Sequence, residues 1–95
     1  MTQTNNILLT GVGGQGIITA SRVLAEVAFI GGWQVKKSEV HGMSQRGGSV
    51  ESHVRLRRDG PVYSPLIPAG EADLLLGFEL LETLRGLPMT RPDAA

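Results

Sequence analysis

The chain has 95 residues, enough for one small domain or for part of one. Nine basic and nine acidic side chains give a formal net charge of zero, which argues against a nucleic-acid or membrane partner. Because the sequence has no cysteine, it cannot form a disulfide or ligate a zinc ion or an iron–sulfur cluster through thiolates, and the cytoplasm is the expected compartment. The sequence shows neither a signal peptide nor the ~20 consecutive apolar residues of a membrane helix.

The first third of the chain predicts a strand, a glycine turn, a helix and a second strand. The apolar run at 6–10 does not alternate, which favours a parallel strand buried on both faces. The helix follows the glycine cluster at 11–16 and ends at two further glycines, as expected for a left-handed cap. With a strand at 33–38 the unit has the size of a β-α-β crossover. The helix, 17–30, gathers its apolar side chains on one face: Ile17, Ala20, Leu24, Val27 and Ala28.

The rest of the chain begins with a polar, glycine-rich loop, predicted over 39–48. Residues 49–57 then alternate between apolar and polar side chains, which indicates a half-exposed strand at a sheet edge or against a partner. A buried strand at 74–76 and a short helix at 79–85 follow an irregular segment.

These elements predict an α/β, Rossmann-like fold, with a mostly parallel sheet and flanking helices. The last strand and helix are typical of the middle of such a domain. A sheet with so few strands leaves an open edge or an uncovered face. We therefore expect residues 1–95 to form a single but incomplete domain.

The glycine cluster fits the dinucleotide fingerprint Gly-x-Gly-x-x-Gly between a strand and a helix. Its backbone N–H groups and the helix N-terminus are candidates to bind an anion or phosphate. The fingerprint expects an acidic residue at the end of the second strand, where this chain has Lys36 and Lys37, which suit a 2′-phosphate. The alternative is that the glycines only permit a close turn. The anion-binding candidates are Gly11, Gly13, Gly14, Gln15 and Gly16.

The loop at 39–48 carries the other candidate site. Arg46 can grip two oxygens of a carboxylate or phosphate, and His41 and Gln45 can help to position such a group. No nucleophile with a base and no metal-ligand spacing accompanies them, so a subunit contact is an equal alternative and no metal site is predicted. The candidates for a subunit interface are Gly47, Gly48, His53 and Arg55.

Positive charge is concentrated in the middle third of the chain, where six of the nine basic residues lie. A solvated face explains this, and an anionic ligand or acidic partner is the alternative. The six are Lys36, Lys37, Arg46, Arg55, Arg57 and Arg58.

Three stretches together resemble a known family. They are Gly-Val-Gly-Gly-Gln-Gly at 11–16, Ser-Glu-Val-His-Gly-Met-Ser-Gln-Arg-Gly-Gly-Ser-Val at 38–50, and Ala-Asp-Leu-Leu-Leu-Gly-Phe-Glu at 72–79. The chain is similar, over roughly positions 5 to 88, to the gamma-type domain of 2-oxoacid:ferredoxin oxidoreductases, and most of all to its indolepyruvate branch. The glycine motif alone is weakly specific, whereas the second stretch at this distance behind it is specific.

The resemblance implies an accessory subunit of an enzyme that oxidatively decarboxylates arylpyruvates to aryl-acetyl-CoA, with ferredoxin as electron acceptor. Thiamine diphosphate, Mg and 4Fe-4S clusters are then expected in a large alpha subunit, with none bound by this chain alone, and ferredoxin and CoA are reached through the complex. Family members are about twice as long, so we expect this chain by itself to be inactive. The alternatives are a stand-alone NAD(P)-binding domain and a non-catalytic interaction module.

Overall fold

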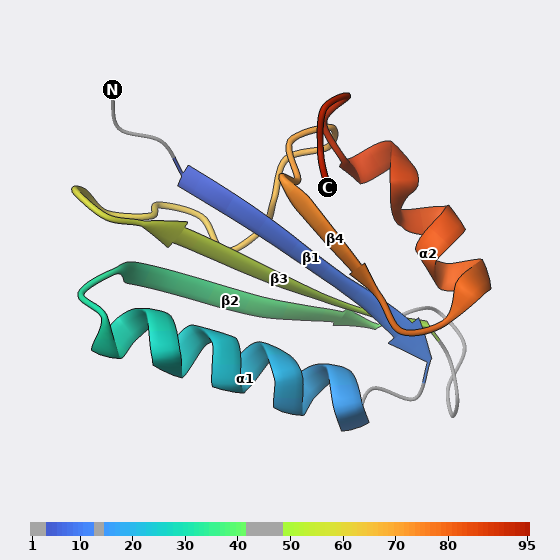
Figure 1. Cartoon of the computed structure of the whole chain (residues 1–95), viewed down its shortest axis with the longest axis horizontal. Coiled ribbons are helices and arrows are strands. Elements are labelled where there is room, and N and C mark those ends of the chain that lie inside the picture. Colours follow the sequence, from blue (N-terminus) through green and yellow to red (C-terminus); the bar gives the residue numbers. More distant parts are fainter. Residues whose placement is uncertain (1–3, 13–14, 42–48) are drawn as a thin grey trace.

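In the part of the chain that the structure describes, helices α1 and α2 pack on a four-stranded sheet (Figure 1). The computed structural model describes residues 4–12, 15–41 and 49–95. Within these residues the strand order is β2-β3-β1-β4. A short 3₁₀ turn, Leu87–Met89, follows the last helix. The elements in chain order are β1 Thr4–Val12, α1 Gln15–Ile30, β2 Gln34–His41, β3 Ser49–Arg57, β4 Leu74–Gly77 and α2 Leu80–Gly86.

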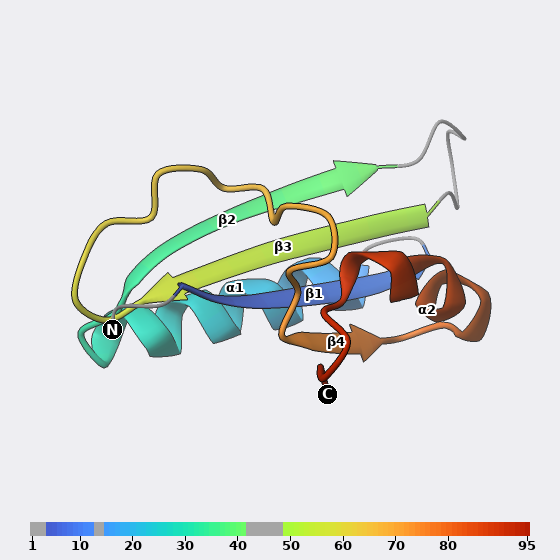
Figure 2. The same cartoon turned by 90° about the horizontal axis from the view of Figure 1, so that it is seen from above.

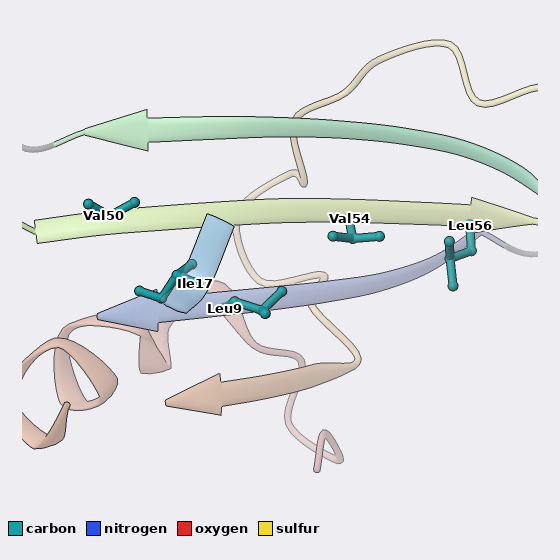
Figure 3. Close-up of a cluster of buried hydrophobic side chains, with 5 residues drawn as sticks. All are labelled: Leu9, Ile17, Val50, Val54 and Leu56. Atoms are coloured by element: carbon teal, nitrogen blue, oxygen red, sulfur yellow. The ribbon is translucent and has the colours of Figure 1, made fainter. Parts of the chain in front are cut away.

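The sheet is covered on both faces by different parts of the chain. Helix α1 lies on one face, and α2 lies on the other together with the irregular segment 58–73, as the view from above shows (Figure 2). Neighbouring residues of β1 serve the two sides: Leu9 packs towards α1, whereas Leu8 packs against Ile67 and Ala72. Figure 3 shows the buried cluster on the α1 side, formed by Leu9, Ile17, Val50, Val54 and Leu56.

The expected α/β class with flanking helices is confirmed, but the expectation of a mostly parallel sheet is wrong. Strand β3 pairs antiparallel with both β1 and β2, and only β4 runs parallel to β1. The reason lies in the connection between β2 and β3, because the few residues from 42 to 48 can close a hairpin but cannot make a parallel crossover of a dozen residues or more. The apolar run of β1 indicates that the strand is buried on both faces, but it does not indicate the direction of the neighbouring strands.

Strand β3 is internal, which corrects its expected place at an edge. It lies between β2 and β1. Its side chains alternate between the two faces of the sheet, and both faces are buried at this strand. Val50, Val54 and Leu56 face the α1 cluster as expected. The opposite face is covered by the segment 58–73, so His53 is only 4% exposed.

Helix α1 ends where the two glycines predict. Gly32 has a φ of 94°, the N–H of Gly32 donates to the carbonyl of Phe29 (3.1 Å), and the N–H of Trp33 donates to the carbonyl of Ala28 (3.0 Å). These two bonds satisfy carbonyls that the last turn leaves unpaired. The predicted apolar face packs on the sheet through Ile17, Ala20, Leu24 and Ala28, but Val27 is exposed, which corrects its assignment to that face.

Replacing Gly32 by alanine should destabilise the fold by about 1–2 kcal/mol, because a side chain at this positive φ is strained. The matched control is Gly31→Ala. Gly31 lacks a positive φ, and a Cβ there meets its nearest atoms at ordinary distances of 3.5 Å or more, so that change should be nearly neutral. Urea unfolding followed by circular dichroism measures both, and equal losses would contradict this account of the helix end.

Candidate functional site

Three connections of the chain meet at one end of the sheet. Val50 of β3 is paired with Gly11 of β1 on one side and with His41 of β2 on the other. Thr10 is paired with Gly77, so β4 also ends here. Strands β1, β2 and β4 therefore all finish at the same end of the sheet (Figure 1). This carboxyl end is the candidate site, and hairpin pairing brings the two predicted loops to it.

Gly11 is needed for packing. It is buried in the last part of β1, and a Cβ built on it would overlap the side chain of Ile17 and come within 3.2 Å of the Cβ of Phe78. The first residues of α1 and the connection after β4 therefore both close over this glycine. The first glycine of the motif is explained by the fold, without a ligand.

Gly77 plays the same part under α2. A Cβ at this position would overlap the side chain of Thr83, whose hydroxyl donates to the carbonyl of Glu79 (2.7 Å). The carboxylate of Glu79 in turn accepts from the N–H of Glu82 (3.0 Å) and caps the helix. The first turn of α2 can thus lie directly on the end of β4.

Gly16 differs from these two glycines. A Cβ built on it meets nothing within 4 Å among the described atoms, and the residue is exposed on the first turn of α1. The fingerprint explains its third glycine by close packing of helix on strand, and Gly16 does not serve that purpose here. The open space beside it, together with Val12 (47% exposed) and Phe78 (53% exposed), leaves an accessible and partly apolar surface at this end of the sheet.

Several predicted site residues lie outside the described residues. They are Gly13, Gly14, Gln45, Arg46, Gly47 and Gly48. His41 is described as the last residue of β2, and Gln15 as the first residue of α1, in each case by the backbone alone. Residues 39–41, which the sequence predicts as the start of the loop, belong to β2 instead.

The structure removes the geometric basis for a ribose or 2′-phosphate site at the lysines. Lys36 and Lys37 lie in the middle of β2, and β3 separates that strand from β1. In the dinucleotide fold the second strand lies next to the first and ends beside the glycine turn. Lys37 instead pairs with Glu39 on its own strand at 2.8 Å.

His53 and Arg55 are held within the chain, away from the carboxyl end. The Nδ1 of His53 accepts the N–H of Ile67 (3.1 Å), and its Nε2 lies 3.1 Å from the carboxylate of Glu51. Arg55 donates to the carbonyls of Ser64 and Leu66. Both side chains therefore anchor the segment 58–73 to β3, and the expected exposed position of His53 is wrong.

The start of β1 holds a buried polar network that the sequence does not predict. Asn6 is 2% exposed, its side-chain oxygen accepts from Arg55 (2.9 Å), and its N–H donates to the carboxylate of Asp73 (2.7 Å). The side-chain amide nitrogen of Asn6 donates to the carbonyl of Glu71. A single asparagine before an apolar run gives no sign of this role, because its partners are about 50 to 67 residues away.

The described basic side chains of the middle third make separate local contacts. Lys37 and Arg55 have the partners described above, Arg57 donates to the carbonyl of Pro61 (3.4 Å), and Arg58 lies over the ring of Trp33 at 5.3 Å. These side chains point to different parts of the fold. These local contacts favour a solvated face, rather than a site for an anionic ligand or acidic partner, as the explanation of the concentrated positive charge.

No group of three or more His, Asp or Glu side chains within 4–12, 15–41 and 49–95 is placed to hold a metal ion. No helix in the same ranges is long and apolar enough to cross a membrane.

Comparison with known proteins gives consistent matches. The sequence profile of the pyruvate ferredoxin/flavodoxin oxidoreductase family matches residues 6–95. Indolepyruvate oxidoreductase subunit IorB of Thermococcus kodakarensis is 52% identical over 80 residues, which make up 84% of this chain and 39% of that protein. The IorB subunit of Methanothermobacter thermautotrophicus is 52% identical over 83 residues, 87% of this chain and 41% of that protein.

A solved structure shares the fold. Pyruvate oxidoreductase subunit PORC of Thermotoga maritima superposes with a TM-score of 0.64 and 22% identity, covering 81% of this chain and 38% of that one. At this identity the likeness concerns the fold alone. The chain thus spans about two fifths of the length of the proteins it matches, 39% and 41% for the two IorB subunits.

Gly11→Ala should destabilise the chain by about 1–3 kcal/mol, because the added methyl group overpacks against Ile17. Gly16→Ala is the matched control within the same motif. It should be neutral or should stabilise α1 by up to about 1 kcal/mol, since alanine favours helix and space is free. Urea unfolding measures both, and a loss at Gly16 as large as that at Gly11 would overturn the distinction.

Proposed function

Because the chain belongs to the pyruvate ferredoxin/flavodoxin oxidoreductase family, we propose that it is part of an accessory subunit of an arylpyruvate:ferredoxin oxidoreductase. The enzyme would decarboxylate indolepyruvate or a similar 2-oxo acid oxidatively, form the aryl-acetyl-CoA and pass the electrons to ferredoxin. The observation that carries this proposal is the 52% identity to subunits named for indolepyruvate, over most of this chain. The likeness to PORC supports the fold on which the proposal rests.

The metal-ligating side chains that the chain can offer support an accessory role for it in the enzyme. A 4Fe-4S cluster is held by cysteine thiolates, and these 95 residues contain none. We therefore assign the clusters, thiamine diphosphate and Mg to a large alpha subunit, which would also bring CoA and ferredoxin to the reaction. The complex is proposed to work in the cytoplasm, the compartment expected for a cysteine-free chain.

The carboxyl end of the sheet is our candidate for the contact with that subunit. Exposed apolar side chains at Val12 and Phe78, and free space at Gly16, suit a protein surface. The glycine turn, with Gly13, Gly14 and Gln15, and the glycines at 47 and 48 would lie against it. Because His53 is buried, it would not touch the partner itself and would support the contact only indirectly, as part of β3.

The loop after β2 would then approach the active site or the CoA channel of the partner. Strands β2 and β3 pair antiparallel, with His41 opposite Val50 at the carboxyl end of the sheet, and residues 42–48 join them in the sequence. Arg46 is the proposed anion or interface contact, and His41 and Gln45 are the proposed positioning groups. The sequence of the loop shows no nucleophile paired with a base and an orienting group, so their proposed part is to position a group.

Arg46→Ala in the assembled complex should lower arylpyruvate-dependent ferredoxin reduction roughly tenfold or more, because a hydrogen bond to a charged group contributes about 1.5–3 kcal/mol. The variant is made in the complex obtained by co-expression with the large subunit. The control is Arg85→Ala, which removes an exposed arginine paired with Glu82 on α2 and should leave turnover unchanged. Unchanged assembly together with unchanged turnover in Arg46→Ala would refute the proposed part of the loop. Failure of the chain to co-purify with any thiamine-dependent subunit would refute the proposed function itself.

A further inference from the structure

The two edges of the sheet differ in how they are closed. Among the described residues, β2 pairs only with β3 and leaves the backbone groups of its other side without a strand (Figure 2). At the opposite edge, Leu75 of β4 donates its N–H to the carbonyl of Ala95 (2.9 Å), and the N–H of Ala95 donates to the carbonyl of Asp73, the residue before β4 (3.0 Å). An edge of eight residues such as β2 is a template for another strand.

An apolar groove accompanies this edge. It lies between α1 and β2, has a volume of about 520 Å³, and includes Phe29, Ile30 and Val35 in its lining. Phe29 is 72% exposed and Ile30 is 84% exposed, so the end of α1 presents large apolar side chains beside the groove. The charged side chains of the groove are Arg22, Glu26 and Lys37. A partner here must cover apolar surface and match charges of both signs.

The charges along β2 match a second copy of the same strand in one register. When two copies pair antiparallel about a two-fold axis perpendicular to the sheet, each side chain stays on its own face and meets a residue whose number has the same parity. Centring the axis on Lys36, Lys37 or Glu39 sets two like charges directly opposite each other. Centring it on Ser38 places Lys37 opposite Glu39 twice, and Lys36 opposite Val40.

Helix α1 has the same self-complementary pattern. It lies on one face of the sheet beside β2, so the α1 helices of the two copies would approach antiparallel on that face. Arg22 and Glu26 are one turn apart in the lining of the groove. An antiparallel approach in which the two helices meet near Leu24 would set the Arg22 of each copy towards the Glu26 of the other and cover the apolar part of each groove.

We propose that the edge of β2 and the adjoining groove form a two-fold interface between two copies of this chain, with Ser38 at the axis. The interface joins two four-stranded sheets into one of eight strands and covers the apolar end of each α1. It uses the side of the fold formed by α1 and β2, and leaves the carboxyl end of the sheet to the other subunit.

The test is the mass in solution of the full 95-residue chain, measured by sedimentation equilibrium at high micromolar concentration. The chain should be a dimer. Lys37→Glu and Glu39→Lys should each weaken dimerisation roughly tenfold or more, because each replaces two attractive cross-strand pairs by two repulsive ones. Circular dichroism confirms that each variant is folded.

An equimolar mixture of the two variants gives the sharpest outcome. The Lys37→Glu chain carries carboxylates at both positions of the pair, and the Glu39→Lys chain carries ammonium groups at both. Two attractive cross-strand pairs therefore form between unlike chains, and the mixture should regain dimers that neither variant forms alone. Repair of the Lys37–Glu39 pair within one chain cannot explain this result, because each variant keeps two like charges in its own strand. The double variant Lys37→Glu/Glu39→Lys should dimerise with itself.

Lys36→Glu is the matched control on the same strand. Its partner in the proposed register is Val40, so it changes the net charge as Lys37→Glu does and should leave dimerisation within about twofold of wild type. A wild-type chain that stays monomeric overturns the proposal, whether or not it binds another protein. So does a dimer that both charge variants leave intact, or a mixture of the two that remains monomeric.

Discussion

The fold depends on the burial of β1 from both sides. Leu8 and Leu9 are almost fully buried and point in opposite directions, one towards the segment 58–73 and the other towards α1. This strand therefore contributes to the buried clusters of both layers. Because β1 also pairs with β3 on one side and β4 on the other, every connection that reaches the carboxyl end is positioned against it.

The glycine turn shows how one motif serves two purposes. Gly11 is required because α1 and the connection after β4 close over the end of β1, and this requirement is satisfied within the chain. Among the described atoms, Gly16 has no such neighbour and leaves free space on the first turn of α1. A pattern of glycines that matches the dinucleotide fingerprint is thus used partly for packing and partly to keep a surface open. The strand order removes the site that a ribose would need.

The polar residues of β3 likewise serve packing within the chain. Alternation along the strand made His53 and Arg55 resemble surface groups, yet they anchor an irregular segment through its backbone. An unstructured stretch can lie on a sheet only when its backbone polar groups find partners, and these two side chains supply them. Among the described residues, the carboxyl end of the sheet and the side formed by α1 and β2 both keep exposed apolar side chains. A subunit of a larger assembly needs such surfaces.

The sequence by itself determined the elements that depend on local periodicity and on local backbone chemistry. The helix and its glycine end, the bounds of β3, the short β4 and the α/β class follow from neighbours in the chain. The resemblance also identified the family, because its loop motif is specific. Only the tertiary structure decided strand order and direction, the internal position of β3, and the partners of Asn6 and His53. These depend on contacts between residues distant in sequence, and an alternating or apolar run records whether a face is buried without recording what buries it.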